Sequence, residues 1–112
     1  MERGEVCWYE FHPPDKRRPV LILTRSSAIH FLNEVTVAPI TSAIRGIPSE
    51  VVLGIEDGMP QDCAVNLDHL QTVPKAKVGR LITSLSLEKM TYAASGLCFA
   101  LGMDDLIRVR FI

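Results

Sequence analysis

A basic run at residues 16–19 is the first stretch that could bind a substrate. Lys16, Arg17 and Arg18 precede Pro19, and the mostly apolar run 20–24 follows. Proline fixes its own backbone angle and restricts the residue before it, so the Arg18 side chain leaves a held backbone. A guanidinium held in this way can bind a phosphate through two parallel hydrogen bonds. A solvated basic turn is an equally open interpretation of these residues.

A hydroxyl group follows a second candidate strand. Residues 34–38 alternate polar and apolar, which predicts a half-buried strand that ends at residues 39–42. The Thr41 hydroxyl could donate a hydrogen bond to a phosphate oxygen there. Threonine at a strand end also commonly bonds only to nearby backbone, so Thr41 alone is weak evidence for a site.

Acid–base chemistry could come from Asn66-Leu67-Asp68-His69. Asp68 could accept a proton and His69 could donate one near a cleft. Residues of these types also occur in turns, where they bond to their own backbone. His12 lies beside the basic run and is a further candidate, with the same reservation.

Short strands must position these side chains. Apolar alternation and turn residues predict strands over 6–11, 20–24, 34–38, 50–53 and 78–82. Residues 63–73 form either two strands joined near Asp68 or one bent strand. Residues 25–33 form a loop or one helical turn.

One helix is predicted to begin near Ser84 or Ser86 and to end at Gly102. Its apolar face is expected to comprise Leu87, Met90, Ala94, Leu97, Cys98 and Leu101. Several short strands before a helix indicate a small, curved, mainly antiparallel sheet or barrel of the α+β type. Residues 1–103 form the expected domain. Residues 104–112 form a tail, and the alternation over 106–112 fits an edge strand, a partner-contacting arm or a disordered segment.

Composition excludes several classes of protein. A 112-residue chain has the size of one domain, and its net charge of −1 does not suit a protein that coats duplex DNA through bulk charge. The widely spaced Cys7, Cys63 and Cys98 match no zinc site, and we expect them to be buried thiols in a reducing compartment. No nucleotide-binding glycine loop or HExxH segment occurs, so we expect no cofactor and no metal. Without an apolar leader or spanning segment, a cytoplasmic protein with no membrane contact is expected.

Four segments occur in an order typical of one protein family. They are residues 3–8 (RGEVCW), 18–23 (RPVLIL), 37–48 (VAPITSAIRGIP) and 65–73 (VNLDHLQTV). In this order they resemble the MazF/PemK family of toxin endoribonucleases, over roughly residues 2–102. The first segment looks like the opening strand of that family and the second like its Arg-Pro strand. The third resembles a family segment nearly residue for residue, and the fourth resembles the strand that usually carries an Asp-Gln pair.

The resemblance implies an SH3-like barrel that forms a homodimer and cleaves single-stranded RNA without a metal. In such enzymes the 2′-hydroxyl attacks the adjacent phosphate, giving a 2′,3′-cyclic phosphate and a 5′-hydroxyl. A cognate antitoxin peptide neutralises the toxin, and the toxin–antitoxin complex binds DNA.

Roles carry over to matching positions. Arg18 would stabilise the charge on the phosphate and assist proton transfer, and Thr41 would orient the phosphate. Asp68 is the candidate general base, with His12 as a proton-transfer partner. The RNA-binding candidates are Lys16, Arg17, Arg25, Ser42, Arg45 and His69. A wider basic track would also include Lys75, Lys77 and Arg80.

Departures from the family pattern leave the RNA sequence preference open. The loop before Arg18 is shorter than usual and lacks a glutamate. His69 stands where glutamine is usual, and Ile47 stands where tyrosine is usual, in a region linked to the antitoxin groove.

Two other functions fit the same fold, because fold alone does not define function. One is a CcdB-type toxin that poisons DNA gyrase, although the tail here lacks the tryptophan typical of those proteins. The other is a non-catalytic SH3-like binding module or a decayed toxin.

Overall fold

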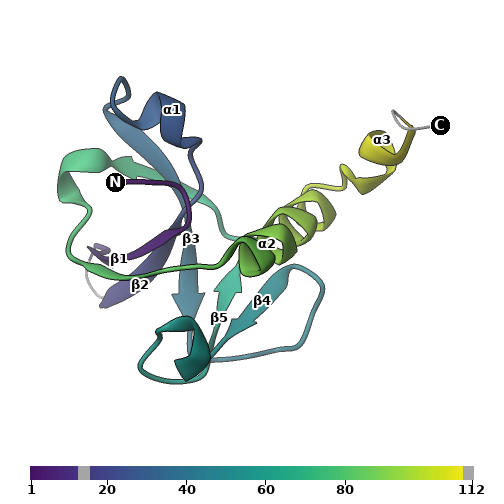
Figure 1. Ribbon diagram of the computed structural model, residues 1–112, viewed down its shortest axis with the longest axis horizontal. Helices are drawn as coiled ribbons and strands as arrows, with labels where there is room; N and C mark the ends of the chain where they lie inside the picture. Colours follow the sequence, from purple (N-terminus) through teal and green to yellow (C-terminus); the bar gives the residue numbers. More distant parts are fainter. Residues whose placement is uncertain (13–15, 110–112) are drawn as a thin grey trace.

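The computed structural model describes residues 1–12 and 16–109, with only the backbone described at positions 108 and 109 (Figure 1). The elements in chain order are β1 (Glu5–Glu10), β2 (Arg17–Ile22), α1 (Ser26–Ile29), β3 (Glu34–Thr41), β4 (Glu50–Leu53), the 3-10 turn η1 (Ile55–Asp57), β5 (Cys63–Asn66), β6 (Gln71–Pro74), the 3-10 turn η2 (Lys75–Lys77), β7 (Leu81–Ser84), α2 (Leu87–Ala100) and α3 (Asp104–Val109). Among the described residues, no helix has both the length and the apolar character that crossing a membrane requires.

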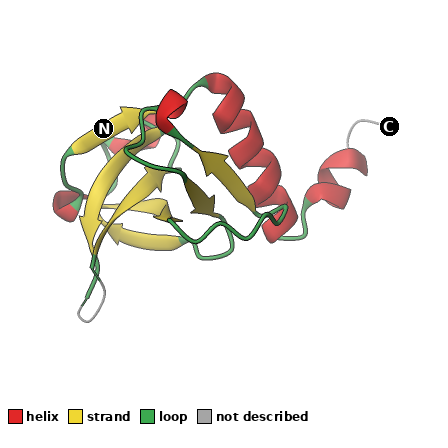
Figure 2. Ribbon diagram, turned by 90° about the horizontal axis from the view of Figure 1, so that it is seen from below, coloured by secondary structure: helices red, strands yellow, loops and turns green. Residues whose placement is uncertain are grey.

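The strands form one curved antiparallel sheet (Figure 2). The strand order is β4-β5-β3-β2-β1-β7, with β6 also paired to β3. On one side, β3 pairs with β2. On the other side, its first half pairs with β6 and its end pairs with β5. The sheet bends around β3, so the predicted small, curved, mainly β fold with a C-terminal helix is confirmed.

Strands β2 and β3 are longer than predicted. β2 already includes Arg17 and Arg18, and β3 runs through Pro39 to Thr41. Pro39 lies between the stretch of β3 paired with β6 and the stretch paired with β5. Its missing N–H therefore removes no ladder bond on that side, and β3 continues past the predicted stretch 34–38 to end at Thr41, within residues 39–42.

Other strand predictions agree more closely. β4 has the predicted bounds, and residues 63–73 form two strands, β5 and β6, rather than one. Residues 75–77 form η2, so β7 begins at Leu81, later than predicted.

The core lies on both faces of the sheet. The alternation within β1 and β2 sends Val6 and Leu21 to the face covered by α2, and Cys7 and Val20 to the other face. This confirms that β2 is an apolar run buried on both sides.

Helix α2 has the predicted ends but a different buried face. The Ser86 side chain caps the helix by accepting a hydrogen bond from the Lys89 N–H, and Gly102 adopts a left-handed φ of +67°. Leu87 is 84% exposed and Leu101 is 55% exposed, so the predicted apolar face is wrong at these positions. The face against the sheet comprises Met90, Ala93, Gly96, Leu97 and Ala100.

Close approach explains why a glycine lies in this face. A Cβ at Gly96 would lie 2.7 Å from Leu67 Cδ1 and 3.2 Å from the Pro48 carbonyl oxygen. Only glycine lets α2 pack this close to the chain before β4.

The segment after Gly102 forms a helix, in the tail for which an edge strand, a partner-contacting arm and a disordered segment were left open. α3 begins with Asp104 and Asp105, whose acidic side chains favour the start of a helix. It lies beyond the end of α2 and away from the sheet, where no strand edge is available for pairing (Figure 1). The edge-strand alternative, made for residues 106–112, is therefore wrong over 106–109, and residues 110–112 lie outside the described chain.

Candidate active site

Antiparallel pairing brings Arg18 and Thr41 together. Val20 pairs with Pro39, so Arg18, two residues before Val20, and Thr41, two residues after Pro39, reach the same end and face of the sheet. Both side chains line one surface cleft of about 360 Å³. The predicted convergence of a guanidinium and a hydroxyl on a shared cleft is thus observed.

This first cleft, here called the Asn66 cleft, is lined mainly by polar groups. Asn66 ends β5, His69 lies in the following turn and Gln71 begins β6. Its full lining is Phe11, Arg18, Pro39, Thr41, Ala43, Arg45, Asn66, His69 and Gln71.

A second cleft of about 270 Å³ shares Arg18 and Thr41 with the first. We call it the Trp8 cleft, because the Trp8 indole contributes its main aromatic surface. The Arg17 guanidinium carbon lies 4.5 Å from the centre of a Trp8 ring. This cation–π contact holds a second cation beside the Arg18–Thr41 pair. The full lining is Trp8, Arg17, Arg18, Pro19, Ile40, Thr41, Ser42, Met59, Pro60, Gln61 and Cys63.

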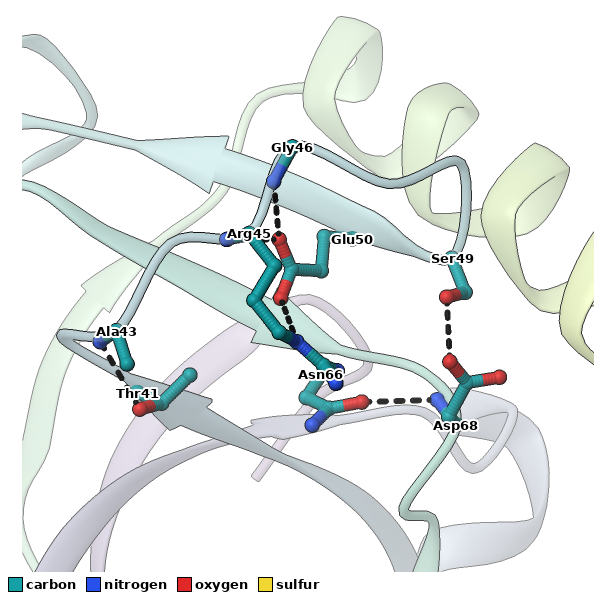
Figure 3. A network of polar contacts seen from close by, with 8 residues as sticks. All are labelled: Thr41, Ala43, Arg45, Gly46, Ser49, Glu50, Asn66 and Asp68. Carbon is teal, nitrogen blue, oxygen red and sulfur yellow. Dashed lines mark hydrogen bonds and ion pairs between the residues drawn. The ribbon is translucent and has the colours of Figure 1, made fainter.

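The Thr41 hydroxyl is oriented by its own turn. Its Oγ1 accepts a hydrogen bond of 3.1 Å from the Ala43 N–H (Figure 3). Because the oxygen accepts this bond, its own proton remains available for donation to a ligand in the cleft.

A buried glutamate organises the loop after β3. The Glu50 carboxylate accepts hydrogen bonds from the Arg45 N–H at 2.9 Å, the Arg45 Nε–H at 3.2 Å and the Gly46 N–H at 3.1 Å (Figure 3). Burial raises the pKa of this carboxyl, but these bonds outweigh burial and the pKa lies below its ordinary value. Glu50 therefore holds Arg45 at the wall of the Asn66 cleft.

Asp68 points to a structural partner. Its Oδ2 accepts a 2.5 Å hydrogen bond from the Ser49 hydroxyl, and its N–H donates to Asn66 Oδ1 at 3.1 Å (Figure 3). Its neighbours Asn66 and His69 line the Asn66 cleft, whereas Asp68 does not.

The other proposed proton-transfer residue, His12, lines a separate cavity of about 530 Å³ with Gln71 and Lys77. Phe11 and Gln71 border both this cavity and the Asn66 cleft. The structure thus brings His69, but neither Asp68 nor His12, to the wall shared with Arg18.

The predicted RNA-binding residues divide into two groups. Arg17 and Ser42 line the Trp8 cleft, while Arg45 and His69 line the Asn66 cleft. Lys16 is exposed and lines neither cleft.

Arg25 is not near Arg18 and lines neither cleft, so its predicted part in RNA binding stays a prediction. It precedes α1 at the opposite end of β2, and a strand rises roughly 3.3 Å per residue. Lys75 is also removed from the wider basic track, because its Nζ donates to the Ile29 carbonyl oxygen at the end of α1.

Several cleft residues were not predicted from the sequence. From the sequence, Trp8 and Phe11 could be stacking surfaces for bases or, with better odds, core residues, and in the structure both are half-buried and line the clefts. No sequence pattern around Glu50 indicated a role in the site, because that role depends on the loop folding back onto β4. Asn66 and Gln71 could have been predicted from the sequence, since their polar side chains flank a short turn between two strands.

The buried thiols do not serve as nucleophiles here. Burial raises the pKa of Cys7, and Glu5 raises it further. Burial likewise raises the pKa of Cys63, with additional contributions from Asp57 and Asp62. Both groups therefore stay protonated at neutral pH. Within residues 1–12 and 16–109, no three His, Cys, Asp or Glu side chains cluster as metal ligands would.

The fold and site define a small, mainly β protein whose clefts present guanidinium and hydroxyl donors suited to a phosphodiester. Comparison with known sequences identifies the family. The chain belongs to the PemK-like, MazF-like toxins of type II toxin–antitoxin systems, whose family model matches residues 2–101.

Similar proteins support this assignment. Endoribonuclease MazF3 of Mycobacterium tuberculosis is 40% identical over 93 residues, covering 83% of this chain and 90% of that protein. Probable endoribonuclease MazF2 of the same species is 38% identical over 98 residues, covering 87% and 94%.

Solved structures show the same fold. The Mycobacterium tuberculosis toxin MazF-mt6 superposes with a TM-score of 0.82 at 36% identity, covering 89% of this chain and 98% of that one. A mycobacterial endoribonuclease solved with its cognate antitoxin gives a TM-score of 0.82 at 24% identity, covering 92% and 96%, which supports the fold alone.

Proposed function

We propose that this protein is a MazF-class endoribonuclease toxin that cleaves single-stranded RNA. The attacking group is the 2′-hydroxyl of the RNA itself. The observation that carries the proposal is the shared position of Arg18 and Thr41 on two adjoining clefts. Family membership and relatives named endoribonucleases support the same activity.

In the proposed reaction the 2′-oxygen attacks the adjacent phosphorus, and the bond from phosphorus to the 5′-oxygen breaks. The products are a 2′,3′-cyclic phosphate and a 5′-hydroxyl. Arg18 stabilises the charge on the phosphate, and the Thr41 hydroxyl donates to one of its oxygens. Held donors of this kind also align the attacking and leaving oxygens.

Proton transfer requires a group that reaches the bound phosphodiester. A guanidinium cannot take up a proton at neutral pH, so Arg18 cannot act as the base. His69 lines the cleft, whereas Asp68 is bonded to Ser49 and His12 lines another cavity. We therefore assign proton transfer to His69, in place of the Asp68–His12 pair expected from the sequence.

The test uses purified protein, one long single-stranded RNA and EDTA. Fragments should carry 5′-hydroxyl ends that a kinase labels without prior phosphatase treatment. Arg18→Ala should lower the cleavage rate by about 100-fold or more, as expected for loss of a preorganised charge donor. Arg25→Ala is the matched control, because that arginine lies at the other end of β2.

Intact RNA, or equal cleavage by the wild type and Arg18→Ala, would overturn the assignment. Trapping of gyrase on DNA with RNA left intact would favour the gyrase-poisoning alternative. Salt-sensitive RNA binding without cleavage would favour the inactive module.

Assembly is the second part of the proposal. We propose a cytoplasmic homodimer that a cognate antitoxin peptide neutralises, in a complex that binds DNA. Large exposed apolar side chains on α2, at its C-cap and on α3 support a partner surface: Tyr92, Phe99, Leu101, Leu106 and Ile107. Light scattering should give twice the 12.4 kDa mass of one chain, and a single-chain mass would contradict the dimer.

A further inference from the structure

We propose that the two clefts bind the two bases beside the cleaved bond in different ways. The Asn66 cleft reads one base through the Asn66 and Gln71 amides, while the Trp8 cleft stacks the other base and accepts many sequences. This inference rests on the proposed nuclease function.

The position of the clefts is the first argument. Arg18 and Thr41 belong to the linings of both clefts, so a phosphate bound by this pair lies at their junction. A phosphodiester carries one nucleoside on each side. One nucleoside therefore enters the Asn66 cleft and the other enters the Trp8 cleft.

The free hydrogen-bonding groups of the Asn66 cleft are the second argument. Asn66 Oδ1 accepts the Asp68 N–H, which leaves its NH₂ group to donate (Figure 3). Within the described residues, the Gln71 side chain has no hydrogen-bond partner, so it offers both a donor and an acceptor. Amides of this kind read the edges of unpaired bases.

Phe11 gives the same cleft a flat apolar wall. Its ring packs against Tyr9, with centroids 4.8 Å apart and an angle of 68° between the rings, and this contact holds the ring in place. A base lying along Phe11 would present its edge to the amides.

The Trp8 cleft has the surfaces needed for stacking. Trp8 and Arg17 provide an aromatic plane and a guanidinium plane in direct contact, and Pro19, Met59 and Pro60 add apolar surface. Bases stack on both kinds of plane, and such stacking tolerates different bases.

Two variants test the reading role. Gln71→Glu replaces an amide donor with an acceptor on an exposed strand end. Asn66→Asp makes the same replacement while keeping an oxygen that can accept the Asp68 N–H. Asn33→Asp is the matched control, because Asn33 is exposed and lines neither cleft.

The measurement is sequencing of 5′-hydroxyl ends from an RNA library with randomised positions. Gln71→Glu and Asn66→Asp should change the preferred base at one position beside the cut by at least about fivefold. Asn33→Asp should leave the profile unchanged. Trp8→Ala should lower the rate for all sequences and keep the profile.

The outcomes separate the two proposals. Absence of cleavage by the wild type overturns the proposed function. Cleavage by the wild type with unchanged profiles in both amide variants overturns the reading role, and a changed profile in Trp8→Ala overturns sequence-tolerant stacking. If an amide variant cuts too slowly, its base preference is measured by binding instead. The folded variant is used to enrich bound sequences from a library of 2′-deoxy-substituted oligonucleotides, and the enriched sequences give the same preference.

Discussion

At the scale of single residues, the hydrogen bond that Thr41 accepts from its own turn orients its hydroxyl to donate a second one to a ligand. The Ala43 N–H fixes the position of the Thr41 oxygen and leaves the hydroxyl proton to donate. Thr41 and Arg18 both belong to the linings of both clefts, so the two donors can act on the same phosphate. The two residues are separated by 23 positions in the chain, so no local pattern joins them, and the β2–β3 register brings them to the same end of the sheet.

Replacing Thr41 tests this arrangement. Thr41→Val keeps the shape but removes the hydroxyl, so kcat should fall by about 100-fold with a smaller effect on KM. Thr41→Ser retains the hydroxyl and should recover most of the rate. Steady-state cleavage of one short RNA measures both parameters, and equal rates for Val and Ser would show that the hydroxyl has no part in catalysis.

At the scale of elements, the loop between β3 and β4 depends on Glu50. Its charged carboxylate accepts bonds from Arg45 and Gly46, and its side chain is 1% exposed. Because the folded-state pKa is lowered, this contribution to stability is present above the unfolded pKa of glutamate. It is lost as the pH falls through the folded value.

Glu50→Gln should therefore destabilise the protein at pH 7 by roughly 1–3 kcal/mol, as expected for lost hydrogen bonds to a charged group. The difference from wild type should shrink in acid, where Glu50 itself becomes neutral. Urea denaturation at several pH values measures this, with exposed Glu2→Gln as the control. A difference that does not depend on pH would contradict the role of the charge.

Gly96 provides a second prediction at this scale. Gly96→Ala improves helix propensity, yet its Cβ would meet Leu67 and the Pro48 carbonyl at short distance. We expect a net loss of about 1 kcal/mol or more, since overpacking of this kind commonly costs 1–3 kcal/mol. Ser95→Ala, exposed on the same helix, should be neutral or stabilising, and denaturant midpoints compare the two.

At the scale of the whole molecule, the net charge of −1 conceals a local concentration of cations. Arg17, Arg18 and Arg45 border the two clefts, whereas Arg25 and Lys75 lie near α1. RNA binding should therefore involve few phosphates. For about three contacts, a plot of log K against log salt should have a slope near −2.

Fluorescence titration of an uncleavable 2′-deoxy-substituted oligonucleotide at several salt concentrations gives this slope. Arg17→Ala should make it less steep, and Arg25→Ala should leave it unchanged. A much steeper slope, sensitive to Arg25→Ala, would mean that the RNA follows a longer basic surface.

Patterns within a few residues were enough to predict the mainly β class, the bounds of β4 and a start of α2 near Ser84 or Ser86. These features arise from backbone geometry and side-chain alternation, which neighbouring residues control. The family motifs likewise identified Arg18 and Thr41 before their positions were known. The rise per residue along β2 could also have shown from the sequence that Arg25 lies far from Arg18.

Long-range contacts decided the rest. Pro39 continues β3 because the partner strand changes beside it, and Gly96 selects the buried face of α2 because Pro48 and Leu67 lie so close. Ser49 binds the Asp68 carboxylate, and the turn brings His69 to the cleft instead. Each outcome depends on residues distant in the chain that become neighbours only when the sheet curves and α2 packs on it.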